Sequence, residues 1–593
     1  MRVCSRLAVL QCLIAFVIFL SNPPAGGYEI SIYEAFPDIF WILVIGGYAA
    51  AFVSVVFAAL ESNPTSRAVA LPLMTIVFLN ILVILLPLSR GYFLNDQTDE
   101  VSHLGMIMDL ALTGRANENL YPISHILAHQ LVTTCNLDPM IVMKLVPALF
   151  YMLLMLGVFL LARELRRGLG VAAMITAFAS ILYFGYYAAA FYPTQFFLSE
   201  IPLVLFVVWK RRWKLLNRST VLIALVLPLP FLHPMGSLFL ILILLLYDLS
   251  HKITARFDWQ KKGIGVSKVI PPMNVTVRLG TLVGVILLLW FSNFLAFHSS
   301  ITKGYEWLFF GSGSSGADAL VGIWNTGAFS VTGLLSQVIR QFGHLAILSL
   351  LTAGILLTSL SKKSRFRQSR SFDVLFFALM FFSLSVVFVI AFFGSFTSTA
   401  GLSVRMLLWT LIPSWIIAGI FFQGILVKNG TRRRVLYAGF LCLLLVAAAI
   451  AGALSTHYSP YVNYTNQEVT EMNWNGMIWF YTAKTDDRTI YFNQFAYRAA
   501  DALYGYESPR PSSIGTFELP PPHLGYDSGD SLGLAVEDRC YVIVDENTRE
   551  FKSILWPDVG LFTLDDLNRL ETDSQVNRIF SNGDPVIYYV IPS

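Results

Sequence analysis

Long apolar segments dominate this sequence and decide what it can fold into. Thirteen of them are close to the roughly 20 residues that a helix needs to cross the hydrocarbon core of a bilayer. The chain is only 13% charged, whereas a soluble domain carries about 25% charged residues. Lipid must therefore be the solvent for much of the chain. The expected segments are residues 4–20, 38–60, 68–88, 141–162, 169–190, 196–209, 219–233, 234–249, 278–298, 342–360, 372–394, 403–427 and 434–455.

Basic residues in the short connections predict the orientation of these segments. Clusters of Lys and Arg recur in alternate loops, at residues 163–167, 210–214, 251–268, 362–367 and 428–434. Short loops rich in Lys and Arg stay on the cytoplasmic side of a membrane. The pattern therefore predicts a multi-pass protein of the cell membrane with a cytoplasmic N-terminus and an extracytoplasmic tail. Residues 4–20 are either the first span or a cleaved signal peptide.

The sequence divides into two parts near residue 455, where hydropathy falls abruptly. Residues 1–455 are predicted to form a helical membrane domain, with extracytoplasmic loop helices within residues 89–140. Residues 456–593 are predicted to form a small α/β domain, because a helical stretch at 467–484 is followed by short apolar runs typical of strands. These expected strands are residues 488–493, 540–545 and 586–591. The small net charge of +4 gives no reason to expect a nucleic-acid partner.

The first large outward loop concentrates acidic residues beside a histidine. Asp96, Asp99 and Glu100 follow a membrane segment closely, and His103 comes soon after. Thr98 is a plausible N-cap for a helix from Asp99, and on such a helix Asp99 and His103 share a face. A carboxylate at the membrane boundary can accept a proton from a hydroxyl group or bind a divalent cation. The alternative is that these acids are ordinary solvated loop residues.

A second helix is predicted in the same loop, opening at Tyr121-Pro122 with proline at an early helical position. Its apolar stripe indicates that it lies along the membrane interface. His125 and His129 are four residues apart, which is a possible metal-binding face. Without a third ligand the metal stays unknown, and Tyr121 and His125 are predicted instead to line a pocket.

These features resemble the GT-C superfamily of membrane glycosyltransferases, which includes the protein O-mannosyltransferases, the lipid A aminoarabinose transferase and many bacterial and archaeal relatives. The resemblance rests on the acidic motif Asp99-Glu100-Val-Ser-His103 after an early membrane segment and on Tyr121-Pro122-x-x-His125 in the next helix. The alternating basic loops and the α/β tail extend it over most of the chain. The Trp-Trp-Asp motif of the oligosaccharyltransferases is absent, which argues against en bloc transfer to asparagine.

The resemblance implies an enzyme that moves a sugar from a polyprenyl- or dolichyl-phosphate donor to a glycan, lipid or protein acceptor. Transfer would occur on the extracytoplasmic face and would invert the anomeric centre. Asp99 would be the base, and Glu100 would be the second catalytic residue, which assists Asp99 or binds a divalent cation. Asp96 would assist them or bind a divalent cation, the one cofactor that the resemblance leaves open.

In such an enzyme, an arginine at the extracytoplasmic boundary of the membrane would stabilise the departing lipid phosphate. Arg405 fits this role because it lies at the outer start of a membrane segment, where a charged residue is costly. The alternative is a snorkelling anchor at the headgroups. The remaining substrate-binding residues that the resemblance implies are Asp96, His103, Tyr121 and His125.

Two other classes of protein are possible for a chain with this pattern. A secondary transporter shows internal repeats and polar residues within its helices, whereas the acids here cluster in an outward loop. A non-catalytic scaffold or receptor, with the tail as its binding module, has no need of an acidic cluster. The sequence therefore favours a glycosyltransferase.

Overall fold

The protein is described by a computed structural model. It covers residues 2–593 except residues 62, 117–118, 167, 211–212, 257–273, 296, 300, 303–304, 306–330, 361–371, 394–399, 429–430, 492–493, 508–510 and 556–560. The expected basic loop at 362–367 and most of the one at 251–268 lie outside the described residues.

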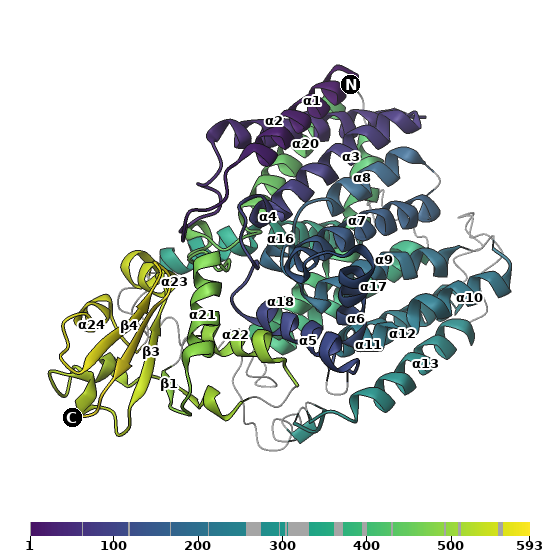
Figure 1. Cartoon of the computed structure of the whole chain (residues 1–593). Helices are drawn as coiled ribbons and strands as arrows, with labels where there is room; N and C mark the ends of the chain where they lie inside the picture. The colour runs from purple at the N-terminus through teal and green to yellow at the C-terminus, as the bar shows by residue number, and fades with distance from the viewer. Residues whose placement is uncertain are drawn as a thin grey trace.

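Helices that pack side by side form the first 455 residues (Figure 1). The longer ones are α1 (Arg2–Ser21), α2 (Asp38–Leu60), α3 (Ser66–Ile84), α7 (Pro139–Leu165), α12 (Pro234–Arg256), α16 (Val331–Leu360), α17 (Phe372–Phe393), α19 (Leu411–Lys428) and α20 (Thr431–Leu454). The shorter ones in this part are α4 (Leu86–Ser89), α8 (Leu169–Ala179), α9 (Pro193–Trp209), α10 (Leu215–Val226), α11 (Leu229–Leu232), α13 (Asn274–Phe291) and α18 (Ala400–Trp409).

Ten helical segments in the described part of the chain are long and apolar enough to cross a membrane. Three shorter apolar helices, Leu169–Ala179, Pro193–Trp209 and Thr276–Phe291, coincide with other expected segments. The chain is therefore a multi-pass membrane protein, as predicted. Small residues bring these helices together: an added Cβ at Gly419 of α19 would lie 2.7 Å from the Cα atom of Ile175 in α8.

One expected span is wrong in its extent, and one expected break is confirmed. The segment at 169–190 is helical only to Ala179, because the chain then turns through Gly185 at a φ of +56°. The short 3-10 helix η1 (Gly185–Ala188) follows, and Pro193 opens the next helix. The predicted break at His233-Pro234 is present, with His233 extended before the proline as steric repulsion requires.

A five-stranded sheet is the centre of the tail, with strand order β2-β1-β3-β5-β4. The strands are β1 (Ile490–Tyr491), β2 (Phe517–Glu518), β3 (Cys540–Val544), β4 (Val576–Ser581) and β5 (Val586–Val590). β1 pairs in parallel with β2 and β3, whereas β5 pairs antiparallel with β3 and β4. The expected strands correspond to β1, β3 and β5, so a small α/β unit at the C-terminus is confirmed.

The helices of the tail are α21 (Glu471–Ala483), α22 (Gln494–Tyr504), α23 (Glu546–Glu550) and α24 (Leu564–Arg569). Figure 1 shows α21 and α22 between the sheet and the membrane helices. Both predicted helices of the first outward loop are present, as α5 (Asp99–Thr113) and α6 (Pro122–Cys135).

The tail packs directly on the first outward loop. Helix α22 lies against α5 at Gly105, where an added Cβ would be 2.4 Å from the backbone oxygen of Asp501. The two parts also share a short antiparallel bridge between Leu94 and Val469. The backbone N–H of Val469 donates to Leu94 at 3.0 Å, and the N–H of Phe93 donates back to Val469 at 2.8 Å. These contacts hold the acidic loop against the tail.

Candidate functional site

Glu100 is the most buried acid of the loop, and its carboxyl group organises the surrounding backbone. Its Oε2 accepts hydrogen bonds from the N–H groups of Asn95 at 2.6 Å and Asp96 at 3.0 Å, and its Oε1 accepts from the N–H of Phe191 at 2.8 Å. Burial outweighs these bonds and raises the pKa of Glu100 to about 8. Glu100 thereby ties the acidic loop to the segment that precedes α9.

Asp96 is also buried and lies at the centre of a small hydroxyl cluster. Its Oδ2 accepts hydrogen bonds from the hydroxyls of Thr98 and Tyr192, and its Oδ1 accepts from the N–H of Thr98 at 3.1 Å. Burial raises the pKa of Asp96 above its ordinary value. Thr98 occupies the N-cap position of α5, as predicted, but its hydroxyl is directed to Asp96 and makes no capping bond.

Asp99, unlike its two neighbours, faces outward. It is the first residue of α5, and 56% of its side chain is exposed. Its Oδ1 lies 2.8 Å from the Nη2 of Arg498, which belongs to α22 of the tail. The Nη1 of Arg498 also donates to the hydroxyl of Ser102 at 2.9 Å. Sequence reasoning missed Arg498, because helix α22 is short and was not predicted.

His103 and His125 form a buried pair whose proton positions follow from their neighbours. The Nδ1 of His103 lies 3.0 Å from the Nε2 of His125. The Nδ1 of His125 lies 2.9 Å from the carbonyl oxygen of Tyr121, so it must carry a proton and donate. Burial lowers the pKa of His103 to about 4 and that of His125 well below its ordinary value. In this neutral pair His103 donates from Nδ1, and its Nε2 is left as an acceptor.

Arg405 lies on α18 beside a group of aromatic residues. It interacts electrostatically with the hydroxyl groups of Tyr187 and Tyr121. Its buried Nε has no hydrogen-bond partner among the described residues. The ring of Tyr121 stacks on His233 with centroids 5.5 Å apart. The structure thus brings together Arg405 and Tyr121, two residues that the sequence had placed in one site.

A row of tyrosines connects the surroundings of Arg405 to those of Asp96. The ring centroids of Tyr186 and Tyr187 are 4.3 Å apart, and those of Tyr187 and Tyr192 are 4.8 Å apart. Tyr458, at the start of the tail, stacks on Tyr186 at 4.7 Å. Sequence reasoning missed Tyr186 and Tyr187, because the stretch that contains them was predicted to be part of a span. The signal available was four tyrosines within ten residues, Tyr183, Tyr186, Tyr187 and Tyr192.

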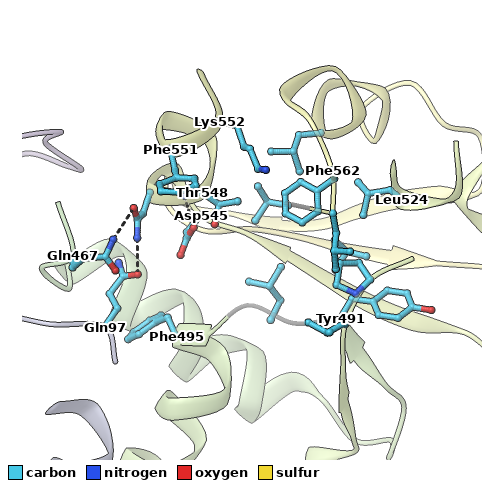
Figure 2. A pocket seen from close by; sticks show the side chains of 18 of the residues that line it. Gln97, Gln467, Tyr491, Phe495, Leu524, Asp545, Thr548, Phe551, Lys552 and Phe562 are labelled. Carbon is cyan, nitrogen blue, oxygen red and sulfur yellow. Dashed lines mark hydrogen bonds between the residues drawn. The ribbon is translucent and has the colours of Figure 1, made fainter. Parts of the chain in front are cut away.

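A cavity of about 480 Å³ lies where the first outward loop meets the tail (Figure 2). The loop contributes Gln97 and Thr98, and the tail contributes the rest of the lining. The tail residues are Tyr458, Tyr464, Gln467, Tyr491, Phe495, Leu519, Pro520, Leu524, Val542, Ile543, Val544, Asp545, Asn547, Thr548, Phe551, Lys552, Leu561, Phe562 and Leu567. The cavity therefore begins immediately beside Asp96 and Asp99 in the chain.

Among the described residues, no group of three or more His, Cys, Asp or Glu side chains is arranged to hold a metal ion. His125 contacts His103 on α5, so one member of the possible His125–His129 metal face already has a partner. Asp96 and Asp99 flank Gln97 and Thr98, the two loop residues that line the cavity.

Comparisons with known proteins give structural matches only. No family model matches the chain, and no curated protein matches it. The chain is similar to the crystal structure of ArnT from Cupriavidus metallidurans bound to undecaprenyl phosphate, with a TM-score of 0.45 and 12% identity over 88% of this chain and 98% of that chain. It is also similar to the same protein in the apo state, with a TM-score of 0.43 and 11% identity over 87% and 97%.

Proposed function

We propose that this protein is a membrane glycosyltransferase that moves a sugar from a polyprenyl-phosphate donor to an acceptor hydroxyl on the extracytoplasmic face. The observation that carries the proposal is the link between an arginine and an acid. Arg405 interacts with Tyr187, Tyr187 packs on Tyr192, and Tyr192 donates a hydrogen bond to Asp96. A cation suited to a phosphate is therefore separated by two tyrosines from Asp96 of the acidic loop, the loop that also carries Asp99.

Arg405 is assigned to the lipid phosphate. Its Nε is buried and without a partner among the described side chains, and a guanidinium left in this state is stabilised by an anion. The planar fork of arginine can donate two hydrogen bonds to two phosphate oxygens. When the sugar leaves, the phosphate keeps the electron pair of the broken bond, and Arg405 stabilises the charge that develops.

Asp99 is assigned as the base. The burial that raises the pKa of Glu100 to about 8 keeps that group mostly protonated at neutral pH, and a protonated acid accepts no further proton. Asp99 is more than half exposed and can be reached by a substrate hydroxyl. It would take the proton while the hydroxyl oxygen attacks the anomeric carbon. One displacement of this kind inverts the anomeric centre.

The other predicted residues are assigned to positioning. Glu100 holds the loop through its three backbone hydrogen bonds, and Asp96 orients Thr98 and Tyr192 or assists in holding a divalent cation. His103 offers its Nε2 as an acceptor for a substrate hydroxyl, and His125 fixes the proton on the opposite nitrogen. Tyr121 lies beside Arg405 and would line the site of the lipid phosphate.

The test is sugar transfer by the full chain, purified and reconstituted in lipid nanodiscs. A panel of polyprenyl-phosphate sugars is supplied with a mixture of glycan, lipid and peptide acceptors, with and without a chelator. Transfer from at least one donor, lost in Asp99→Asn, is the expected result. Loss with the chelator would add a divalent cation to the site. Uptake of a solute in proteoliposomes, without transfer from any donor, would favour the transporter alternative instead.

A further inference from the structure

We propose that the cavity between the first outward loop and the tail sheet is the acceptor site, and that it takes a neutral glycoside with an apolar aglycone. This inference rests on the proposed transferase function and names the class of its acceptor. The cavity volume of about 480 Å³ is within the range of small-molecule sites. Its two ends differ in chemistry, and each end indicates one part of the ligand.

The end next to the loop is made of carboxamides. Gln97 is only 4% exposed, and its Oε1 accepts from the Nδ2 of Asn547 at 3.1 Å. The Oδ1 of Asn547 accepts in turn from the Nε2 of Gln467 at 3.2 Å. We call Gln97, Gln467 and Asn547 the amide cluster. Figure 2 shows Gln97 and Gln467 at one end of the cavity, with dashed lines for the hydrogen bonds of the cluster.

One hydrogen-bond donor of the amide cluster has no partner among the described residues. The Nε2 of Gln97 is buried and makes no hydrogen bond to any residue that the structure describes. A buried amide N–H without an acceptor destabilises the folded protein, so this donor indicates an oxygen supplied by a ligand. Neutral amides suit the hydroxyl and ring oxygens of a sugar, and the ring of Tyr458 adds an aromatic surface at the same cavity.

The other end of the cavity is apolar. Figure 2 shows Leu524 and Phe562 on the side away from the amide cluster, and the exposed side chain of Leu519 also lines the cavity. Burial of apolar surface from a ligand there is favourable at roughly 25 cal/mol per Å². A ligand that fills both ends therefore has a polar head and an apolar body.

The charges of the lining favour a neutral ligand over the phosphate donor. The charged side chains in the lining are Asp545 and Lys552, and their charges are opposite. Lys552 lies over the ring of Phe562, with its Nζ 5.0 Å from the centroid. Arg405, which we assign to the donor phosphate, is absent from the lining. The sugar donor and the acceptor thus bind at separate sites.

The position of the amide cluster connects the bound sugar to the reaction. Gln97 and Thr98 stand between Asp96 and Asp99 in the chain, and both line the cavity. The hydroxyl of Thr98 also donates to Asp96. A sugar held by Gln97 therefore lies beside the acidic loop, two residues along the chain from Asp99, the acid that we assign as the base.

Binding of soluble aryl glycosides to the full chain in nanodiscs tests this site without relying on turnover. The probes are 2-naphthyl glucoside, methyl glucoside and 2-naphthyl phosphate, measured by saturation-transfer NMR and calorimetry. We expect naphthyl glucoside to bind at least about tenfold more tightly than methyl glucoside, because the ring adds buried apolar area. Equal binding of these two probes, or tighter binding of naphthyl phosphate, would overturn the proposal.

Two pairs of matched variants localise the binding. Leu519→Glu places a charge in the lining, whereas Leu534→Glu changes an equally exposed leucine of the tail outside it, at 67% and 63% exposure. Gln97→Leu removes the unpaired donor, whereas Gln130→Leu changes an exposed glutamine of α6. We expect a loss of about tenfold or more in affinity for naphthyl glucoside in the first member of each pair only.

The outcomes separate the site from the function. If Leu519→Glu and Leu534→Glu bind the probe alike, the acceptor site is overturned, and sugar transfer can still be measured with other acceptors. If the glycoside binds as expected, mass spectrometry of reactions with donor lipids shows whether it receives a sugar. Glycosylation of the naphthyl glucoside supports the acceptor assignment. Binding without transfer from any donor, although another acceptor is glycosylated, overturns that assignment alone.

Discussion

Arg498 in the tail and Asp99 at the start of α5 form an ion pair across the junction between the tail and the first outward loop, with 2.8 Å between Nη2 and Oδ1. Because Arg498 also donates to Ser102 one helical turn further on, its guanidinium spans the first turn of α5. The tail is therefore in direct contact with the residue that we assign as the base. If Asp99 is the base, this contact gives the tail a part in the chemistry.

Replacing Asp99 with asparagine should abolish most of the sugar transfer. Loss of a general base typically lowers the rate by about 10²–10⁴-fold, while donor binding should persist, because Arg405 is unchanged. The measurement is turnover and donor affinity in nanodiscs, with the exposed tail residue Asp530→Asn as the matched control. Near-normal turnover in Asp99→Asn would move the base to Asp96 or Glu100.

Replacing Arg498 with alanine should lower turnover far more than it lowers stability. The pair is partly exposed, with Asp99 at 56% and Arg498 at 24%, and such pairs contribute roughly 0–1 kcal/mol. The guanidinium nevertheless holds Asp99 in place, and loss of positioning costs up to about 10²-fold in rate. We expect kcat to fall, KM for the donor to change little, and Arg498→Lys to recover part of the activity.

A large contribution of Arg498 to the stability of the fold would argue against a positioning role. If Arg498→Ala lowers the melting temperature strongly and activity only in proportion to the folded fraction, the arginine is structural. Circular dichroism and turnover at matched folded fractions distinguish the two cases. Arg578→Ala, which removes an exposed arginine of β4 from its pair with Glu571, is the control.

The pH dependence of stability should carry the signature of Glu100. Burial raises its pKa in the folded protein to about 8 from the ordinary value of 4.5. The folded state therefore binds more protons than the unfolded state between these values, and stability falls as the pH rises through that window. Glu100→Gln cannot ionise, so its melting temperature should fall less between pH 5 and pH 8 than that of the wild type.

Differential scanning fluorimetry of both proteins in nanodiscs, at pH 5, 6, 7 and 8, measures this difference. All other titratable groups are common to the two proteins. A difference between them in how steeply the melting temperature falls with pH is therefore due to Glu100. Parallel curves would mean that Glu100 ionises in the folded state as easily as in the unfolded chain. In that case Glu100 would return as a candidate for the base.

The helical spans and the inner strands could be predicted from the sequence, because each is specified by its own residues. Apolar length marks α2 or α17, and the run Cys540–Val544 has the β-branched and aromatic composition of a buried strand. By contrast, β4 is mostly exposed and has no comparable pattern. The stretch after Ala179 is as apolar as a span, and its apolar length hides the turn that the chain makes at Gly185.

The candidate site was predictable only in its local parts. The acids of the loop are neighbours in sequence, so their clustering could be recognised from the motif. Their different environments could not, since the partners of Glu100 and Asp99 include Phe191 and Arg498, which are 91 and 399 residues away. The amide cluster could not be predicted either, because Gln97 and Asn547 are 450 residues apart in the sequence.

Arg405 provides a test of the lipid-phosphate assignment that is separate from the acids. A lysine at this position keeps the charge but loses the planar fork that matches two phosphate oxygens. We therefore expect Arg405→Lys to bind the donor more weakly than the wild type, and Arg405→Ala to bind it more weakly still. Each lost charge-assisted hydrogen bond is worth about 1.5–3 kcal/mol, which is roughly a 10- to 150-fold loss of affinity.

The alternative role of Arg405, a snorkelling anchor at the headgroups, predicts a different order. An anchor needs only a long cationic side chain, so lysine would replace arginine without loss. The unpartnered, buried Nε of Arg405 favours the phosphate role, because an anchor would place its guanidinium among lipid headgroups and water. Donor affinity and turnover of both variants in nanodiscs decide between the roles. Full affinity of Arg405→Lys for the sugar donor would show that the residue is a membrane anchor and would contradict its assignment to the lipid phosphate.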